Sequence, residues 1–121
     1  MPKKILIVDD EPDVLKVVAF RLNKLDCEIY TAIDGQEAWE KAKQIKPDLI
    51  LLDLRLPLMD GTEVCRRVKA DAELSHIPVI LLSASADVLV EKVKLCKADT
   101  YLLKPFNAEE LLNTVKKFLG I

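Results

Sequence analysis

Residues 48 to 61 have the sequence Asp-Leu-Ile-Leu-Leu-Asp-Leu-Arg-Leu-Pro-Leu-Met-Asp-Gly. A run of apolar residues from 49 to 52 leads directly into Asp53, and Pro57 and Gly61 then interrupt the chain. A continuous apolar run this short, bounded by turn residues, is typical of a strand that is buried on both faces of a parallel sheet. We therefore expect an acidic side chain at the C-terminal end of a central strand. That edge is where open α/β sheets bind their ligands.

The rest of the chain alternates in the same way between short apolar runs and helical patterns. Strands are predicted at residues 4–8, 27–32, 48–53, 77–82 and 100–103. Apolar residues recur at helical spacing over 11–24, over 38–45, from 61 onward, over 87–96 and from 107 to 119. Five repeats of strand and helix predict an α/β fold, a doubly wound five-stranded parallel sheet with helices on both faces. The periodicity leaves the strand order open.

Composition and charge limit the classes of function. With 121 residues we expect one domain over 1–121, and the net charge of −2 argues against a nucleic-acid-binding domain. No apolar run approaches the ~20 residues that span a bilayer, and the N-terminal residues lack the pattern of a secretory signal. Cys27, Cys65 and Cys96 lack metal-ligand spacing and indicate buried thiols in a reducing compartment. We expect a cytoplasmic protein with no direct nucleic-acid contact and no membrane insertion.

Polar side chains follow four of the five predicted strands. They are Asp9 and Asp10 after the first strand, Asp53 at the end of the third, Ser83 after the fourth and Lys104 after the fifth. The C-terminal ends of parallel strands lie along one edge of a sheet. If the first, third and fourth strands are neighbours, these side chains meet in one pocket.

The chemistry of this set points to phosphoryl transfer. Three carboxylates so close together repel one another, and a divalent cation relieves the repulsion. An all-oxygen ligand set suits Mg²⁺. Lys104 adds a mobile positive charge and Ser83 adds a hydroxyl donor. With these groups a carboxylate can attack a phosphoryl group, which would give an aspartyl phosphate at Asp53.

Each of these residues also has a simpler structural explanation. Asp10 or Ser83 could cap the helix that follows it. Asp53 could face solvent at the end of its strand, and Lys104 could be an ordinary loop lysine. All four explanations would have to hold together at four strand ends along one sheet edge, which favours the functional interpretation.

Several stretches taken together resemble the receiver domain of two-component response regulators. They are Ile7-Val8-Asp9-Asp10-Glu11, Asp53-x-x-x-Pro57-x-x-x-Gly61, Ser83-Ala84 and Tyr101-Leu102-Leu103-Lys104-Pro105-Phe106, in the family's order and near its spacing. The resemblance covers essentially the whole chain and implies a single chemotaxis-regulator-like receiver. It also implies a flavodoxin-like fold with the strand order 2-1-3-4-5.

The resemblance implies a phosphorylation-dependent signalling switch. Asp53 would accept a phosphoryl group from the phosphohistidine of a sensor histidine kinase or a histidine phosphotransfer protein. Asp9, Asp10, Asp53 and the backbone carbonyl of Arg55 would hold Mg²⁺ or Mn²⁺. The domain would catalyse only its own phosphorylation and dephosphorylation, so we expect a signalling domain rather than an enzyme with an external substrate.

Other residues would carry the response to phosphorylation. Ser83 would bond the phosphoryl group, Lys104 would pair with it, and the Lys104–Pro105 peptide is expected to be cis. Tyr101 would turn inward on activation. Leu103 should share the side of Tyr101, either forming an apolar partner surface or packing beneath the fourth helix. An unknown downstream partner would bind the fourth helix, the fifth strand and the fifth helix.

One stretch departs from the family pattern. The family usually has Gly-Ala-Asp before the last strand, whereas this chain has Lys97-Ala98-Asp99, and the interval from Ser83 to Lys104 is one residue shorter than usual. A glycine there ends the helix in a left-handed conformation, which costs a lysine on the order of 1 kcal/mol. We therefore predict that the fourth helix ends differently, shortened or shifted.

Three other functions remain open from the sequence. A haloacid-dehalogenase-like phosphatase uses the same Asp and Mg²⁺ but needs an acid where Arg55 stands, two residues after Asp53. A flavodoxin-like electron carrier needs a Ser/Thr/Gly phosphate loop after the first strand, where Asp9-Asp10-Glu11 would repel a phosphate. A receiver-shaped interaction module that is never phosphorylated is the third alternative.

Overall fold

Strands and helices alternate along the whole chain in a computed structural model that describes residues 2–121. In chain order the elements are β1 (Lys4–Val8), α1 (Pro12–Leu22), η1 (Asn23–Leu25), β2 (Glu28–Ala32), α2 (Gly35–Ile45), β3 (Leu49–Asp53), α3 (Gly61–Ala70), β4 (Val79–Ser83), α4 (Ala86–Cys96), β5 (Thr100–Leu103) and α5 (Ala108–Leu119). The predicted α/β alternation is confirmed.

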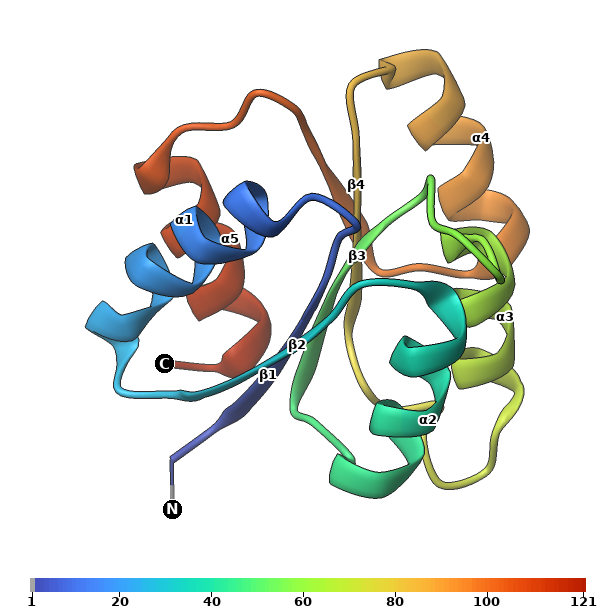
Figure 1. Cartoon of the computed structure of the whole chain (residues 1–121), viewed down its shortest axis with the longest axis horizontal. Coiled ribbons are helices and arrows are strands. Elements are labelled where there is room, and N and C mark those ends of the chain that lie inside the picture. The colour runs from blue at the N-terminus through green and yellow to red at the C-terminus, as the bar shows by residue number, and fades with distance from the viewer. Residues whose placement is uncertain (1) are drawn as a thin grey trace.

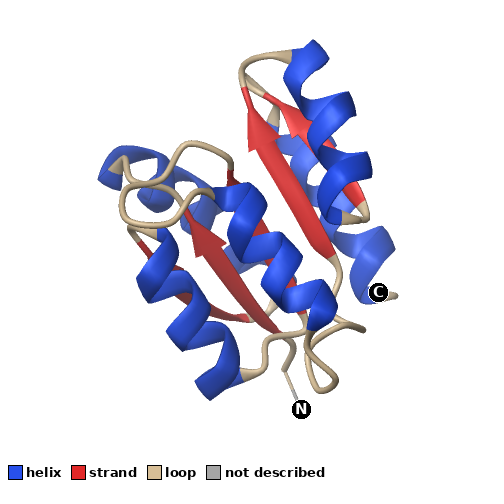
Figure 2. Cartoon of the chain, turned by 90° about the vertical axis from the view of Figure 1, so that its right-hand side faces the viewer, coloured by secondary structure: helices blue, strands red, loops and turns tan. Residues whose placement is uncertain are grey.

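The strands form one parallel sheet in the order β2-β1-β3-β4-β5, which confirms the order that the resemblance implied. Helices α1 and α5 cover one face of the sheet, and α2, α3 and α4 cover the other (Figure 1). Figure 2 shows the strands side by side behind the three-helix layer. Among residues 2–121, no helix is long and apolar enough to cross a membrane.

Strand β3 lies at the centre of the sheet and is buried along its whole length. Leu49 and Leu51 pack into the apolar cluster beneath α1 and α5, whereas Ile50 and Leu52 pack into the cluster beneath α2, α3 and α4. Because both faces are covered by helices, every position of this strand is apolar until Asp53. This explains the continuous apolar run in the sequence.

The strand register aligns the C-terminal ends of the four strands that are followed by, or end in, polar residues: β1, β3, β4 and β5. Val8 pairs with Leu52, so Asp9 and Asp53 follow at the same level of the sheet. Asp53 pairs with Leu82, which precedes Ser83. Ser83 in turn pairs with Leu103, immediately before Lys104. The polar residues that were predicted to converge therefore lie along one edge of the sheet.

The end of β3 is shaped by a close approach of Gly61, the first residue of α3. A Cβ atom at Gly61 would lie 2.2 Å from the carbonyl oxygen of Asp53 and 2.9 Å from the Cα of Leu54. The Gly61 N–H donates to the Leu54 carbonyl at 2.9 Å. Only glycine leaves room for α3 to begin this close to the end of the strand.

The prediction about the end of the fourth helix is wrong. Helix α4 has 11 residues, as many as α1 and α2, and Lys97 follows it with φ 61° and ψ 34°, the left-handed conformation that glycine would adopt. The next two N–H groups, of Ala98 and Asp99, donate to the carbonyls of Val93 and Val79. These hydrogen bonds and the burial of Cys96 outweigh a conformational cost of about 1–2 kcal/mol.

Two elements differ from their predicted bounds by two residues at one end. The fourth strand was expected over 77–82 but spans Val79–Ser83, because Pro78 has no N–H for the sheet and lies just before it. The first helix was expected over 11–24 but ends at Leu22, and its last predicted residues form the 3-10 turn η1.

Candidate functional site

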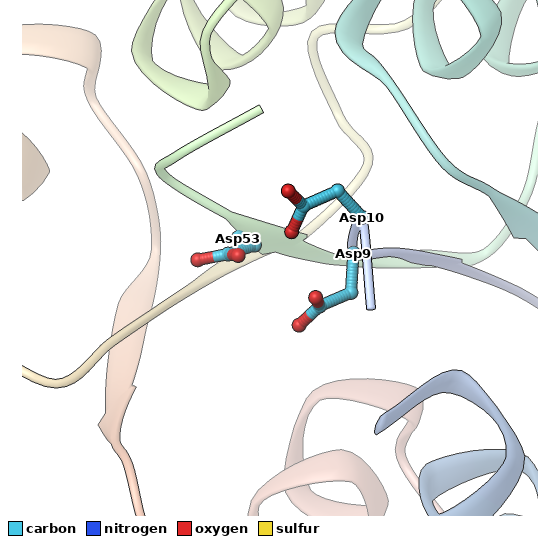
Figure 3. A group of neighbouring side chains, drawn as sticks. All are labelled: Asp9, Asp10 and Asp53. Carbon is cyan, nitrogen blue, oxygen red and sulfur yellow. The ribbon is translucent and has the colours of Figure 1, made fainter. Parts of the chain in front are cut away.

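Three carboxylates gather at the C-terminal edge of the sheet. Asp9 and Asp10 directly follow β1, and Asp53 is the last residue of β3 (Figure 3). One oxygen from each lies within 4.8 Å of the others. Asp9 is fully buried, Asp53 is 7% exposed, and Asp10 lies at the surface. The structure therefore brings together the acidic residues that the sequence predicted to converge.

Lys104 partly neutralises this cluster. Its Nζ forms an ion pair of 2.8 Å with Asp9 Oδ2 and lies 3.6 Å from Asp53 Oδ2. The other oxygen of Asp9 accepts a hydrogen bond of 3.0 Å from the Glu11 N–H. Asp9 is thus fixed on both sides, and the ammonium group stands between two carboxylates.

The electrostatic environment shifts the pKa values of Asp53 and Lys104. Burial raises the pKa of Asp53 and the charge of Asp9 adds to this, while Lys104 and the backbone N–H groups of Leu54 and Arg55 act in the opposite direction. Burial alone would lower the pKa of Lys104. Its hydrogen bond to Asp9 and the nearby carboxylates outweigh burial, so the pKa of Lys104 is raised and its ammonium group stays charged.

Ser83 completes the cleft. It is the last residue of β4, and it lines a cavity of about 390 Å³ together with Asp10, Asp53 and Lys104. Its Oγ accepts a hydrogen bond of 3.3 Å from the Ser85 N–H. The cleft therefore holds carboxylates, an ammonium group and a hydroxyl within one small volume.

The two capping explanations do not describe these residues. Helix α1 begins after Glu11 and α4 after Ser85, and neither helix has a side-chain hydrogen bond at its N-cap. Asp10 and Ser83 each stand before those positions. Helix capping therefore explains neither residue.

The remaining predicted residues lie around the cleft or away from it. Arg55 lines the cleft, and its backbone carbonyl stays a predicted metal ligand. The Lys104–Pro105 peptide is cis. Tyr101 and Leu103 lie on β5 with 38% and 40% of their surface exposed, on either side of buried Leu102, so Leu103 does not pack beneath α4.

Sequence reasoning missed two backbone groups that orient the site. The N–H groups of Glu11 and Ser85 donate to the side chains of Asp9 and Ser83, in each case two residues earlier in the chain. Asp and Ser side chains commonly bond the backbone two residues on. The spacing of a polar strand-end residue and a following loop was therefore the available signal.

Known proteins are similar to this chain in fold and in sequence over almost its full length. The family described as the response regulator receiver domain matches residues 5–116. The chain belongs to this family. A receiver domain is a signalling domain, and the acidic cluster of this receiver lies at the sheet edge where its strands end.

Relatives and solved structures agree with this assignment. The receiver is 40% identical over 121 residues to the DNA-binding dual master transcriptional regulator RpaA of Synechocystis, covering 98% of this chain but only 49% of RpaA. The receiver domain of the sensor histidine kinase PA1611 from Pseudomonas aeruginosa PAO1, which contains magnesium in its active-site cleft, has a TM-score of 0.91 and 30% identity, and the match covers 100% of both chains. A BeF3-activated DrrB receiver domain has a TM-score of 0.88 and 32% identity, again over 100% of both chains.

Proposed function

We propose that this receiver is a phosphorylation-dependent signalling switch in which Asp53 accepts a phosphoryl group from a phosphohistidine. The donor would be a sensor histidine kinase or a histidine phosphotransfer protein. The observation that carries the proposal is the placement of Asp53 in the cleft, with Lys104 Nζ 3.6 Å from its Oδ2 and Ser83 lining the same cavity.

The residues of the cleft have distinct roles in the transfer. An oxygen of Asp53 attacks phosphorus, the P–O bond forms, and the P–N bond to the donor imidazole breaks. Lys104 then pairs with a phosphoryl oxygen and stabilises the negative charge. The Ser83 hydroxyl donates to another phosphoryl oxygen. The domain would catalyse only two reactions, its own phosphorylation and the hydrolysis that removes the phosphoryl group again.

The acidic cluster fits a divalent cation. Asp9, Asp10 and Asp53 supply oxygen ligands, which Mg²⁺ and Mn²⁺ prefer, and their oxygens lie within 4.8 Å of one another. The Arg55 carbonyl would be a further oxygen ligand. When bound, the cation would neutralise charge on the transferring phosphoryl group. The magnesium-containing PA1611 receiver supports this part of the proposal.

The conformational effect of phosphorylation would be transmitted to the partner surface through the segment that follows Ser83. The Ser83 hydroxyl now accepts from the Ser85 N–H, directly before α4. A phosphoryl group adds about −1.5 to −2 charges and new acceptor oxygens, so Ser83 would turn toward it and leave Ser85. Such differential contacts shift a two-state equilibrium. The BeF3-activated form of DrrB supports a switch of this kind.

The expected response is a change of the face formed by α4, β5 and α5. Tyr101 has 38% of its surface exposed and can therefore become buried by turning inward. Leu103 and Val90 lie on β5 and α4 with 40% and 45% of their surfaces exposed. The downstream partner would bind this face in the phosphorylated state.

The proposal is tested by phosphorylation from a small-molecule donor. Wild-type protein is incubated with acetyl phosphate and Mg²⁺, and its intact mass is measured. We expect the mass of one phosphoryl group on the wild type and none on Asp53→Asn. The control Asp26→Asn changes an exposed aspartate in a left-handed conformation that Asn tolerates, so it should be labelled like the wild type.

Other outcomes would identify the alternatives. Equal labelling of Asp53→Asn would contradict the assigned phosphoacceptor. Absence of covalent phosphate on the folded wild type would favour an interaction module that is not phosphorylated. Release of many equivalents of free phosphate without a phosphorylated intermediate accumulating would favour a phosphatase.

A further inference from the structure

Two thiols lie against each other between α3 and α4, outside the cleft. The Cys65 Sγ donates to the Cys96 carbonyl oxygen at 3.4 Å, so its sulfur lies against Cys96. Both residues are buried, with 0% and 1% of their surfaces exposed. Cys27, the third cysteine, lies half-buried just before β2 and provides an internal comparison.

The contact makes the two thiols chemically different. The interaction between the two side chains lowers the pKa of Cys96 and raises that of Cys65. Dithiol sites that cycle between thiol and disulfide use the same division, with one nucleophilic sulfur and one partner sulfur. The pair therefore has the arrangement needed for oxidation within one chain.

Helix α4 buries fewer residues than the other α-helices. Leu89 and Cys96 are its only buried residues, whereas α3 buries five. Its N-cap Ser85 makes no side-chain cap hydrogen bond, and Lys97 closes its C-terminal end in a left-handed conformation. Elements with few buried apolar contacts open most readily. Opening of α4 would expose the sulfur of Cys96.

We propose that Cys65 and Cys96 are a redox-active dithiol that a peroxide converts into a disulfide between α3 and the last residue of α4. The Cys96 thiolate attacks one peroxide oxygen, an S–O bond forms, and the O–O bond breaks with loss of one water after protonation. The Cys65 sulfur then attacks the sulfenic sulfur, the S–S bond forms, and a second water leaves. Two thiols are oxidised by two electrons, and one peroxide is reduced to two waters.

The disulfide would restrict the element that carries the phosphorylation response. It would join α4 covalently to α3 at the end remote from Ser83. This consequence rests on the proposed function, because α4 is expected to move after Asp53 is phosphorylated. Formation of the disulfide itself does not depend on phosphorylation.

The test treats the folded, reduced protein with hydrogen peroxide and then blocks free thiols with iodoacetamide under denaturing conditions. We expect a product that has lost the mass of two hydrogens, with one alkylated thiol and a crosslinked peptide pair that contains Cys65 and Cys96. Cys27→Ser should form the same crosslink. Cys65→Ala and Cys96→Ala should not form it, and the peptide map of the wild type does not depend on whether these variants fold.

Two further measurements keep this proposal separate from the phosphorylation proposal. Asp53→Asn should form the disulfide at the wild-type rate, whereas the oxidised wild type should show a smaller acetyl-phosphate-induced change in hydrogen exchange of α4 than the reduced form. Oxidation of Cys27 while Cys65 and Cys96 stay alkylatable would overturn the dithiol. A disulfide that leaves the exchange of phosphorylated α4 unchanged would overturn its regulatory role.

Discussion

The residues of the cleft are arranged for chemistry at the expense of stability. Asp9, Asp10 and Asp53 share a small volume, and Lys104 contacts Asp9 and Asp53. Burial and the charge of Asp9 raise the pKa of Asp53, which shows that its charged form is destabilised there. Sites of this kind gain stability when a charge is removed and lose function with it.

Asp10→Asn should therefore stabilise the metal-free protein. Removing one of the three like charges lowers their repulsion, and we expect a gain of about 0.5–2 kcal/mol in the free energy of unfolding. Added Mg²⁺ should stabilise the wild type through binding to the native state and should stabilise the variant much less. Thermal denaturation with and without Mg²⁺ measures both effects. Equal stabilisation of the two proteins by Mg²⁺ would show that Asp10 is not a ligand.

Gly61→Ala should disturb the site without changing any of its polar groups. The added Cβ would lie 2.2 Å from the Asp53 carbonyl oxygen, so the start of α3 or the end of β3 must move. We expect a loss of about 1–3 kcal/mol in stability and slower labelling of Asp53 by acetyl phosphate. Urea unfolding and intact mass provide the two measurements.

Gly120→Ala is the matched control for this steric effect. A Cβ at Gly120 meets nothing within 4 Å, although its φ of 72° is unfavourable for alanine. Its cost should therefore be about 1 kcal/mol, with labelling unchanged. Loss of labelling in both variants would point to general destabilisation rather than to the end of β3.

At the scale of elements, α4 buries fewer residues than any other α-helix, namely Leu89 and Cys96. Like α2, it is followed by a lysine in a left-handed conformation, here Lys97. The same segment follows Ser83 and contributes to the expected partner surface. Because elements with few buried apolar contacts open most readily, we expect α4 to be the α-helix that changes position when Asp53 is phosphorylated.

Lys97→Gly should stabilise the end of α4. Glycine adopts the φ of 61° found at this position without a Cβ clash, so we expect a gain of about 0.5–1 kcal/mol. Lys94→Gly is the matched control, because it lies inside α4 and should lose about 1 kcal/mol. Urea unfolding measures both changes. Destabilisation by Lys97→Gly similar to that of Lys94→Gly would show that Lys97 has an ordinary helical conformation in solution.

Elements were predicted well where burial on both sides or a clear helical stripe determined them. The run before Asp53 is apolar because β3 is covered on both faces, and β5 begins and ends as expected. The end of α4 could not be predicted in this way. The propensity of lysine argued against a left-handed conformation, but the hydrogen bonds of Ala98 and Asp99 with Val93 and Val79 determine the turn.

At the scale of the whole molecule, the sequence pattern alone did not determine which strands are neighbours. Alternating strands and helices predict a parallel sheet, but several strand orders satisfy the same alternation. The order 2-1-3-4-5 came from the family resemblance, and the structure confirms it. Convergence of the polar strand ends depended on that order. The backbone donors of Glu11 and Ser85 have no residue-type signature of their own, so the polar strand-end residue two positions earlier was their only signal in the sequence.

The ion pair between Asp9 and Lys104 also has a consequence for how the chain folds. Its two residues are 95 positions apart, and one follows β1 while the other follows β5. Pairing of β1 with β2 and β3 requires much shorter loops to close. We therefore expect the contact between Asp9 and Lys104 to form after the folding transition state, when β5 has docked.

Lys104→Met should then act mainly on the rate of unfolding. Loss of the ammonium leaves the buried Asp9 carboxylate without its ion pair, and we expect a destabilisation of about 1–3 kcal/mol. In stopped-flow urea experiments the unfolding limb should rise while the refolding limb stays near that of the wild type. Slower refolding would show instead that the contact between Asp9 and Lys104 is already formed in the folding transition state. The Lys104 ammonium group, which we propose pairs with the phosphoryl group, would thus reach its place only in a chain whose last strand has folded.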